Sequence, residues 1–360
     1  MSYKSIGAYL PGDSTVNLRD VIFPEPGHGE VLIKVKSSTI CGSDIRAIYR
    51  EHLGKGPEAY QNKIAGHEPA GQIIKCGKGM RRFKEGDRVV VYHISGCGCC
   101  YDCRRGYMIS CQSDLRAAYG WQRDGGMSEY MIAEEKDLVL LPDELTYTDG
   151  AQIACGFGTV YEGLGKIGIG GDDAVLVVGL GPVGLAALML ARAMGAEKIV
   201  GVDTVAERCD IAKSLNLADD VFVSDKEVLE KVMATTQYRG FEKTIDCSGH
   251  TLGRQLCVRA TRKWGKMAMI GEGGTMEFNP SSDLIHDQKT IYGSWVTSIW
   301  KMEELVERIV RWKIHPEDLV THRFTLDKAA EAYKLMAEGK CGKVAIVFDE
   351  EIKAEHGKHQ

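Results

Sequence analysis

The sequence lacks an uninterrupted apolar run that could cross a membrane. Its one long apolar stretch, residues 174–191, is broken by Gly179, Gly181, Pro182 and Gly184, which suits a buried strand, a turn and a helix. The N-terminus lacks the apolar core and the small-residue cleavage site of a signal peptide. We therefore expect a cytoplasmic protein with reduced thiols and no membrane partner.

Excess positive charge is also missing. The chain carries 45 Lys and Arg residues against 50 Asp and Glu residues, a net charge of -5, and it has no basic run, so we predict no nucleic-acid partner. Internal repeats and low-complexity segments are absent too, which leaves room only for short linkers. The 360 residues, 44% of them hydrophobic, suffice for two domains that each have their own core.

Two patterns of strands and helices follow one another along the chain. The first half contains short alternating or apolar runs, such as residues 31–37, 70–77 and 87–94, bounded by turn residues, and predicts a β-rich, barrel-like domain. From residue 174, strands alternate with amphipathic helices, which predicts a parallel, doubly wound sheet and an α/β fold class. The helix and strand pairs are 174–180 with 181–195, 198–203 with 205–216, and 243–249 with 253–265.

After residue 292 the pattern changes again. Residues 302–313 and 329–340 predict two helices, and residues 343–349 predict a closing strand, so we expect the chain to return to the first domain. The apolar segment 264–274 is a candidate edge strand for pairing between subunits.

The glycine-rich segment GLGPVG, from Gly179 to Gly184, has the spacing of a dinucleotide-binding loop. Gly179 allows the tight turn, Gly181 allows close approach of a pyrophosphate, and Gly184 allows close packing of the helix. Asp203 ends the next predicted strand and is placed to accept the ribose hydroxyls, which favours NAD over NADP. Two alternatives stay open, since Asp203 also suits a helix cap and the Arg208 cation suits a phosphate. Pro182 and Val183 complete the loop.

Four cysteines at the spacing C-x2-C-x2-C-x7-C indicate a metal site. They lie in one short stretch, and in a reducing compartment a tetrahedral zinc ion explains four thiolates better than two disulfides do. The predicted site is closed, and therefore structural. Cys99 is a possible competing ligand, but the register that uses Cys100 keeps the even spacing. The four predicted ligands are Cys97, Cys100, Cys103 and Cys111.

A second group of candidate ligands is dispersed. Cys41 lies in TICGSDIR, His67 and Glu68 lie in AGHEPAG, and Cys155 lies in QIACGFGT. Taken singly, each has an ordinary structural explanation, since a lone Cys is commonly buried and a lone His commonly satisfies a local hydrogen bond. Their spacing alone does not join them.

The chain resembles the zinc-dependent medium-chain alcohol dehydrogenases, including their sorbitol, threonine and sugar dehydrogenase members, essentially from end to end. The motifs that carry this resemblance are CGSD, GHEPAG, the four-cysteine stretch, DGGMSEY, CGFGT, GLGPVG and Asp203. The resemblance implies a GroES-like catalytic domain over residues 1–155, with the structural zinc lobe at 95–113. It also implies a Rossmann NAD-binding domain over 156–292 and a return to the catalytic domain over 293–360.

The resemblance further implies that Cys41, His67 and Cys155 bind a catalytic zinc ion, the Cys2His set known for alcohol dehydrogenase. Two zinc ions per chain, one catalytic and one structural, and NAD are the implied cofactors. Ser43 matches the hydroxyl that begins the proton relay of the family. Glu68 either exchanges with water at the metal or makes a contact beside it, and the sequence does not decide between these roles.

Two positions near the proposed metal differ among relatives. Many of them have a histidine where this chain has Arg46, and arginine stays protonated and cannot act as a base. The relay then ends at ribose and water or at another group, for which His52 is a candidate. Asp44 matches a carboxylate that orients His67, or else it caps a turn. Many polyol and threonine dehydrogenases carry Glu where this chain has Cys155, so Cys155 resembles the simple alcohol dehydrogenases.

Further positions match the coenzyme and substrate pockets of the family. Thr159 and Val183 match residues that position the nicotinamide, although ordinary packing explains them equally well. His93 falls at a pocket position, where a polar imidazole suggests a hydroxylated substrate. Trp121 and Trp295 are candidate pocket residues, and tryptophan is equally a core residue.

These observations predict hydride transfer between NAD and a secondary alcohol of a polyol, sugar or cyclitol, in a homodimer or homotetramer. The alternatives are a dehydrogenase of simple alcohols or of threonine-like amino alcohols, and a non-catalytic NAD-binding protein. A zinc-free quinone or enone reductase is disfavoured because such chains lack the cysteine ligands.

Overall fold

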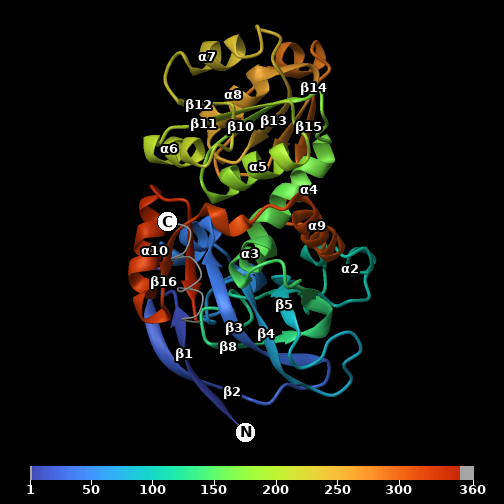
Figure 1. Ribbon diagram of the computed structural model, residues 1–360, viewed down its shortest axis with the longest axis vertical. Coiled ribbons are helices and arrows are strands. Elements are labelled where there is room, and N and C mark those ends of the chain that lie inside the picture. Colours follow the sequence, from blue (N-terminus) through green and yellow to red (C-terminus); the bar gives the residue numbers. More distant parts are fainter. Residues whose placement is uncertain (1, 349–360) are drawn as a thin grey trace. The chain divides into compact units, whose positions relative to one another are not determined.

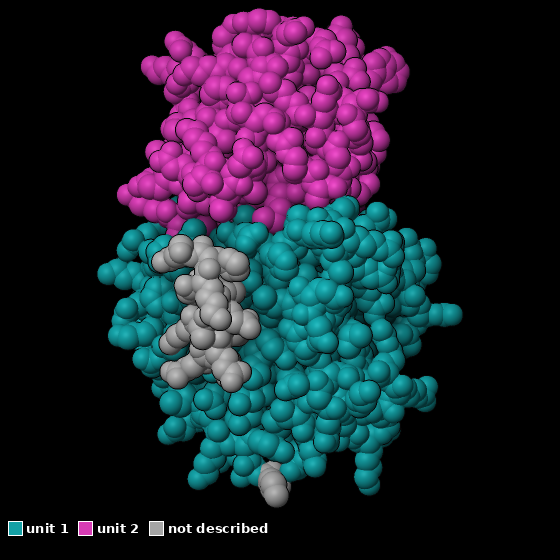
Figure 2. Space-filling model, in the orientation of Figure 1, with its two compact units in different colours: residues 1–155, 298–339, 343–360 teal, residues 156–297, 340–342 magenta. Residues whose placement is uncertain are grey.

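The computed structural model describes residues 2–348 and divides into two compact units (Figures 1 and 2). Unit 1 comprises residues 1–155, 298–339 and 343–360, and unit 2 comprises residues 156–297 and 340–342. Across the described part of the chain, no helix combines the length and the apolarity that a bilayer crossing requires.

Unit 1 is built on a seven-stranded sheet whose order is β16-β17-β3-β4-β5-β9, with β8 paired to β3. Neighbouring strands are antiparallel except β16 and β17, which run parallel. The strands are β1 (Tyr3–Tyr9), β2 (Asn17–Phe23), β3 (Glu30–Ile40), β4 (Glu68–Cys76), β5 (Arg88–Val91), β6 (Ile94–Ser95), β7 (Ala117–Ala118), β8 (Tyr130–Glu134), β9 (Leu138–Leu140), β16 (Val320–Phe324) and β17 (Lys343–Val347). The helices are α1 (Gly42–Asp44), α2 (Tyr101–Arg104), α3 (Tyr147–Gln152), α9 (Ile299–Trp312) and α10 (Ala329–Glu338).

The last strand of unit 1 joins the two ends of the chain. β17 pairs with the end of β3, where Val344 lies opposite Ile40 and Ala345 lies opposite Thr39. All five residues of β17 are buried, so a segment near the C-terminus completes the core of a sheet that the N-terminal half begins. In the structure, the chain thus returns to the sheet of unit 1 through β17.

Unit 2 contains a six-stranded parallel sheet of order β12-β11-β10-β13-β14-β15. Its strands are β10 (Ala174–Val178), β11 (Lys198–Asp203), β12 (Asp220–Val223), β13 (Phe241–Asp246), β14 (Thr261–Met269) and β15 (Thr290–Gly293). Its helices are α4 (Gly158–Ile167), α5 (Pro182–Ala193), α6 (Ala206–Ser214), α7 (Val228–Ala234) and α8 (Thr251–Ala260). Helices α5 and α8 cover opposite faces of the sheet (Figure 1), as expected for a doubly wound fold.

Burial explains why β10 and β11 read as continuous apolar runs. Both lie inside the sheet, and helices cover both faces, so side chains on either side of each strand are shielded from water. The α/β fold class, with a β-rich part and a doubly wound parallel sheet, is confirmed.

Two sequence-based expectations in unit 2 are wrong. The helix predicted over residues 253–265 ends at Ala260, and Thr261 begins β14. The segment 264–274 was expected to supply an edge strand, but β14 lies between β13 and β15, and β15 is the edge. The helix was predicted too long because Thr261 and Trp264 extend a helix-like pattern by a few residues. Pairing of β14 with β13 overrides that local preference.

Candidate metal and coenzyme sites

The four cysteines of the predicted structural zinc site lie together in unit 1. The ligand atoms of Cys97, Cys100, Cys103 and Cys111 are all within 4.8 Å of one another. The Sγ atoms of Cys97 and Cys103 are 4.0 Å apart, and a tetrahedral zinc ion with Zn–S bonds of about 2.3 Å requires sulfurs separated by about 3.8 Å. The four thiols therefore fit a zinc ion with little rearrangement.

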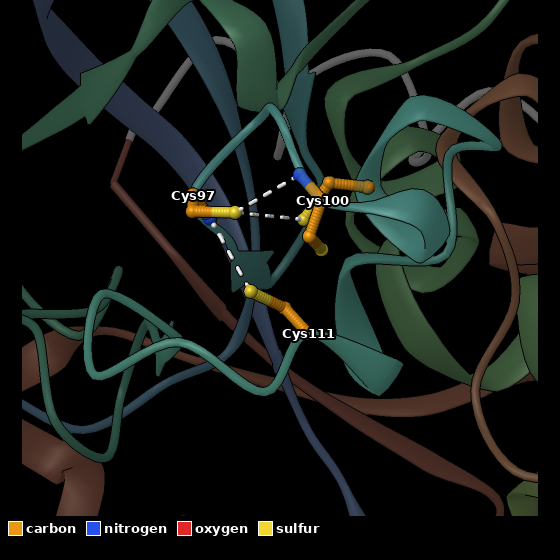
Figure 3. A group of neighbouring side chains, drawn as sticks. Cys97, Cys100 and Cys111 are labelled. Atoms are coloured by element: carbon orange, nitrogen blue, oxygen red, sulfur yellow. Dashed lines mark hydrogen bonds between the residues drawn. The ribbon is translucent and has the colours of Figure 1, made fainter.

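Backbone amides of the same loop stabilise the sulfurs. The amide of Cys100 donates to the Sγ of Cys97 at 3.3 Å, and the amide of Cys97 donates to the Sγ of Cys111 at 3.4 Å (Figure 3). Amides of Cys99 and Cys100 lower the pKa of the Cys97 thiol to about 6. The loop thus favours the thiolate form that a metal ion requires.

Cys99 remains outside this group. Its Sγ lies 3.6 Å from that of Cys97, but its side chain is exposed and it is not one of the four clustered ligands. The register that uses Cys100 is therefore the one that the fold assembles.

The dispersed candidate ligands also converge, and all of them belong to unit 1. The ligand atoms of Cys41, His67, Glu68 and Cys155 lie within 4.8 Å of one another. Cys41 directly follows β3, and His67 directly precedes β4. Because β3 and β4 are antiparallel, with Thr39 opposite Glu68, the end of one strand meets the start of the other. Strand pairing therefore creates a juxtaposition that sequence spacing did not reveal.

Asp44 fixes the orientation of His67. Its Oδ1 lies 2.8 Å from Nδ1 of His67, and its Oδ2 accepts the backbone amide of Cys41 at 2.9 Å. Because a carboxylate only accepts, Nδ1 of His67 carries the proton and Nε2 presents its lone pair as a metal ligand. Asp44 is fully buried, and the predicted contact with His67 is present.

The Asp44→Asn variant is expected to bind the zinc ion of this cluster about 10–100-fold more weakly. An amide has one accepting oxygen, so it cannot accept from both His67 and the Cys41 amide, and its NH2 group faces a donor. Competition with a chromophoric zinc chelator measures the affinity. Asp124→Asn is the matched control, because the Oδ1 of Asp124 accepts the Ile64 amide and lies outside the ligand cluster. Unchanged zinc affinity in Asp44→Asn would show that Asp44 does not orient the ligand.

The two thiols of this cluster influence one another. The pKa of Cys41 is lowered well below its usual value, chiefly by a hydrogen bond from Cys155, and the pKa of Cys155 is raised by that same bond and by burial. The Cys41 thiol therefore ionises more readily than the Cys155 thiol. Such a pair binds a divalent cation with release of the remaining proton.

Glu68 is held by two groups that the sequence did not identify. Lys343, at the start of β17, forms an ion pair with Glu68, and both side chains are almost completely buried. The Thr39 hydroxyl donates to Oε2 of Glu68 at 2.6 Å. Burial raises the pKa of Glu68 to about 7, although Lys343 opposes this shift. Lys343 carried no signal in the sequence, because a lysine at the start of a strand normally faces solvent.

Two of the predicted pocket residues lie beside His67. The ring centroid of His93 is 5.2 Å from that of His67, and the indole of Trp121 meets His67 edge-on at 5.0 Å. Nδ1 of His93 donates to the carbonyl of Ala154 at 2.8 Å, while burial lowers the pKa of His93 to about 3. His93 is thus neutral, and its Nε2 is a hydrogen-bond acceptor.

The remaining predicted residues of the catalytic chemistry have simpler surroundings. Ser43 is half-buried in α1, one residue before Asp44. His52 is engaged elsewhere, with Nε2 lying 2.9 Å from the carbonyl oxygen of Leu10. The last two candidates, Thr159 and Trp295, belong to unit 2, whereas His67 belongs to unit 1. Thr159 is half-buried in α4, and Trp295 is exposed.

The glycine-rich loop joins β10 to α5 in unit 2. Gly179 has a φ of 92°, which glycine adopts at no steric cost. A Cβ at Gly184 would lie 1.7 Å from the carbonyl oxygen of Gly179, so no side chain fits there. A Cβ at Gly181 would meet nothing closer than 3.8 Å, and its backbone is therefore open to a ligand. Pro182 and Val183 form the first turn of α5. These features fit a pyrophosphate at the start of the helix.

Asp203 ends β11, next to this loop. Its Oδ2 accepts the amide of Leu180 at 2.6 Å, and its Oδ1 accepts the amide of Val205 at 2.8 Å. Arg208, from α6, approaches Oδ2 at 3.4 Å. The structure thus places the predicted ribose-binding carboxylate of Asp203 and the Arg208 cation together at the carboxyl end of β11.

Comparison with known families gives two matches along the chain. The model of the alcohol dehydrogenase GroES-like domain matches residues 27–143, and the model of the zinc-binding dehydrogenases matches residues 182–311. An uncharacterized zinc-type alcohol dehydrogenase-like protein of Escherichia coli K12 is 53% identical over 347 residues, which cover 95% of this chain and 98% of that protein.

Solved structures agree with these matches. A short chain alcohol dehydrogenase from Escherichia coli CFT073, complexed with NADH, has a TM-score of 0.84 at 26% identity and covers 96% of this chain and 99% of its own. Galactitol-1-phosphate dehydrogenase from Escherichia coli has a TM-score of 0.84 at 25% identity, with coverage of 95% and 100%.

Proposed function

Because the chain belongs to the zinc-binding alcohol dehydrogenase family, we propose that it is an NAD-dependent dehydrogenase of a polyol, sugar or cyclitol. The observation that carries the proposal is the buried cluster of Cys41, His67 and Cys155, in which Asp44 fixes the tautomer of His67. Two sulfurs and one imidazole nitrogen are the protein ligands of a catalytic zinc site, and Glu68 lies within 4.8 Å of these ligand atoms.

In the proposed reaction a hydride would pass from the carbinol carbon to the nicotinamide of NAD, and the hydroxyl proton would leave to solvent. Cys41, His67 and Cys155 would hold a zinc ion, which would lower the pKa of the substrate hydroxyl. Ser43 takes that proton first in this proposal, because it lies two residues after Cys41 and is half-buried. Arg46 is exposed and always protonated, so its role is electrostatic and the proton passes to ribose and water.

Substrate preference follows from the acceptor nitrogen of His93. Its Nδ1 is committed to Ala154, so Nε2 is available to accept a hydrogen bond from a second hydroxyl of the substrate. Trp121 places an aromatic ring beside His67 as well. Galactitol-1-phosphate dehydrogenase, a structural relative, is named for a phosphorylated polyol, which supports a polyhydroxylated substrate.

Turnover on a panel of polyols, aldoses, cyclitols, amino alcohols and simple alcohols tests the proposal. We expect NADH formation, followed by its absorbance, to be fastest with a polyol, an aldose or a cyclitol. Faster turnover of simple alcohols or of threonine would replace the proposed substrate class. No NADH from any substrate with the zinc-loaded protein would exclude the dehydrogenase itself.

The His93→Phe variant is expected to lose polyol activity selectively. Without the acceptor, a bound hydroxyl loses one hydrogen bond, so kcat/KM for the best polyol falls about tenfold. For 2-propanol, which has no second hydroxyl, we expect a change below about threefold. His52→Phe is the control, because the imidazole of His52 also lies against a backbone carbonyl, that of Leu10, and His52 belongs to neither cluster of ligand atoms found among the described residues. Equal losses for both substrates would mean that His93 acts through packing alone.

Location and assembly form part of the same proposal. Two thiol clusters require reduced cysteines, which supports a cytoplasmic location. We propose a homodimer or homotetramer, and light scattering of the purified protein tests this assembly.

A further inference from the structure

The loop of the predicted structural zinc site holds one sulfur more than a tetrahedral ion uses. Four of its five cysteines have ligand atoms within 4.8 Å of one another, and Cys99 is the fifth. Cys99 is exposed, whereas the four predicted ligands are half-buried, namely Cys97 and Cys100, or buried, namely Cys103 and Cys111. A solute that oxidises thiols therefore reaches Cys99 more readily than any of the four ligands.

The sulfur of Cys99 is in contact with one of those ligands. Its Sγ lies 3.6 Å from the Sγ of Cys97, closer than the 4.0 Å between the Sγ atoms of Cys97 and Cys103. Gly98, between the two cysteines, has a φ of 75°, which glycine adopts at no steric cost. Because the side chain of Cys99 is exposed, it is free to rotate and close the gap to an S–S bond of about 2.0 Å.

Cys97 is tied to the rest of the zinc loop. Its Sγ accepts the amide of Cys100 at 3.3 Å, and its own amide donates to the Sγ of Cys111 at 3.4 Å. A closed structural zinc site uses four thiolates, and a sulfur in a disulfide no longer carries the charge that binds the metal. A bond between Cys97 and Cys99 would therefore leave three thiolates and open the site to competing ligands.

We propose that Cys97 and Cys99 form a redox pair that releases the structural zinc ion when a peroxide oxidises it. This inference goes beyond the proposed dehydrogenase function and does not depend on it. Hydrogen peroxide transfers one oxygen atom to the Sγ of Cys99, which gives a sulfenic acid and one molecule of water. The Sγ of Cys97 then attacks that sulfur, so that the S–S bond forms, the S–O bond breaks and a second molecule of water leaves. The two thiols lose two electrons and two protons in total, and the peroxide accepts them.

Zinc release from the zinc-loaded full chain in hydrogen peroxide tests the inference without turnover. A chromophoric zinc chelator follows the released ion, and peptide mapping by mass spectrometry identifies the disulfide. We expect the wild-type chain to release about one equivalent of zinc first, with Cys97 joined to Cys99. A thiol reductant with added zinc should then restore the site.

The Cys99→Ser variant should release this zinc more than about tenfold more slowly, because the sulfur that the peroxide reaches first is gone. Its zinc content should equal that of the wild type, since Cys99 is not one of the four clustered ligands. Cys76→Ser is the control and should leave the rate unchanged, because Cys76 is a half-buried free thiol outside both clusters. If Cys99→Ser does not fold, Cys99→Ala replaces it.

Retention of all zinc by the wild-type chain would overturn the inference, whether or not the disulfide between Cys97 and Cys99 forms. Release from Cys99→Ser at the wild-type rate would overturn it as well. So would a first disulfide between Cys41 and Cys155, since the zinc then leaves the buried cluster. Failure of the dehydrogenase proposal appears in NADH formation instead, and it leaves these zinc and thiol measurements unchanged.

Discussion

The Cys41→Ser variant is expected to lose one of two bound zinc ions and to retain its fold. Cys41 is one of the two sulfurs in the buried cluster with His67 and Cys155, and serine is a poor zinc ligand at neutral pH. Without the metal, nothing stabilises the alkoxide, and several kcal/mol of lost stabilisation correspond to a fall in kcat/KM of about a thousandfold or more. Metal analysis and NADH formation measure the two effects.

Cys76→Ser is the matched control for this variant. Cys76 lies at the end of β4, belongs to neither thiol cluster and is half-buried. We expect it to keep both zinc ions and full turnover. Wild-type activity in Cys41→Ser would contradict the catalytic assignment, whereas loss of both ions would mean that the two sites are coupled through folding.

The Lys343→Met variant is expected to destabilise the protein by about 3–5 kcal/mol. Lys343 and Glu68 are both buried and form an ion pair, so removing the cation leaves the carboxylate of Glu68 buried without its cationic partner. Burial already raises the pKa of this carboxyl to about 7, and the loss of Lys343 removes the group that opposes that rise. Denaturant unfolding of the zinc-loaded protein measures the loss.

A double variant separates the charge from the packing. Glu68→Gln with Lys343→Met removes both charges and should recover most of the lost stability, because neutral groups of similar size cost little when buried. Lys328→Met is the control, since Lys328 pairs with Glu331 in an exposed ion pair that contributes little to stability. If the single and double variants are equally unstable, the aliphatic stem of Lys343 matters more than its charge.

The sequence was most informative where function requires a local pattern. Gly179, Gly181 and Gly184 belong to one turn and one helix start, and the structure explains Gly179 by its positive φ and Gly184 by its close contact with the carbonyl of Gly179. The four-cysteine stretch is equally local, because one loop carries all four sulfurs. A short-range pattern can be recognised without the fold.

Residues that act through strand pairing could not be found in this way. Thr39 and Lys343 meet Glu68 because β3 pairs with β4 on one side and with β17 on the other, and these strands are far apart in the chain. For the same reason, only the family resemblance predicted that one site contains Cys41, His67 and Cys155. Tertiary pairing also explains why β14 begins at Thr261, where the local pattern predicted more helix.

X-ray absorption at the zinc edge tests the central claim most directly. Four sulfurs at one site, and two sulfurs with one imidazole at the other, predict about two zinc ions per chain and an average of about three sulfurs per zinc at about 2.3 Å, with imidazole scattering. A single zinc ion surrounded by sulfur alone would contradict the account, because Cys41, His67 and Cys155 would then hold no metal.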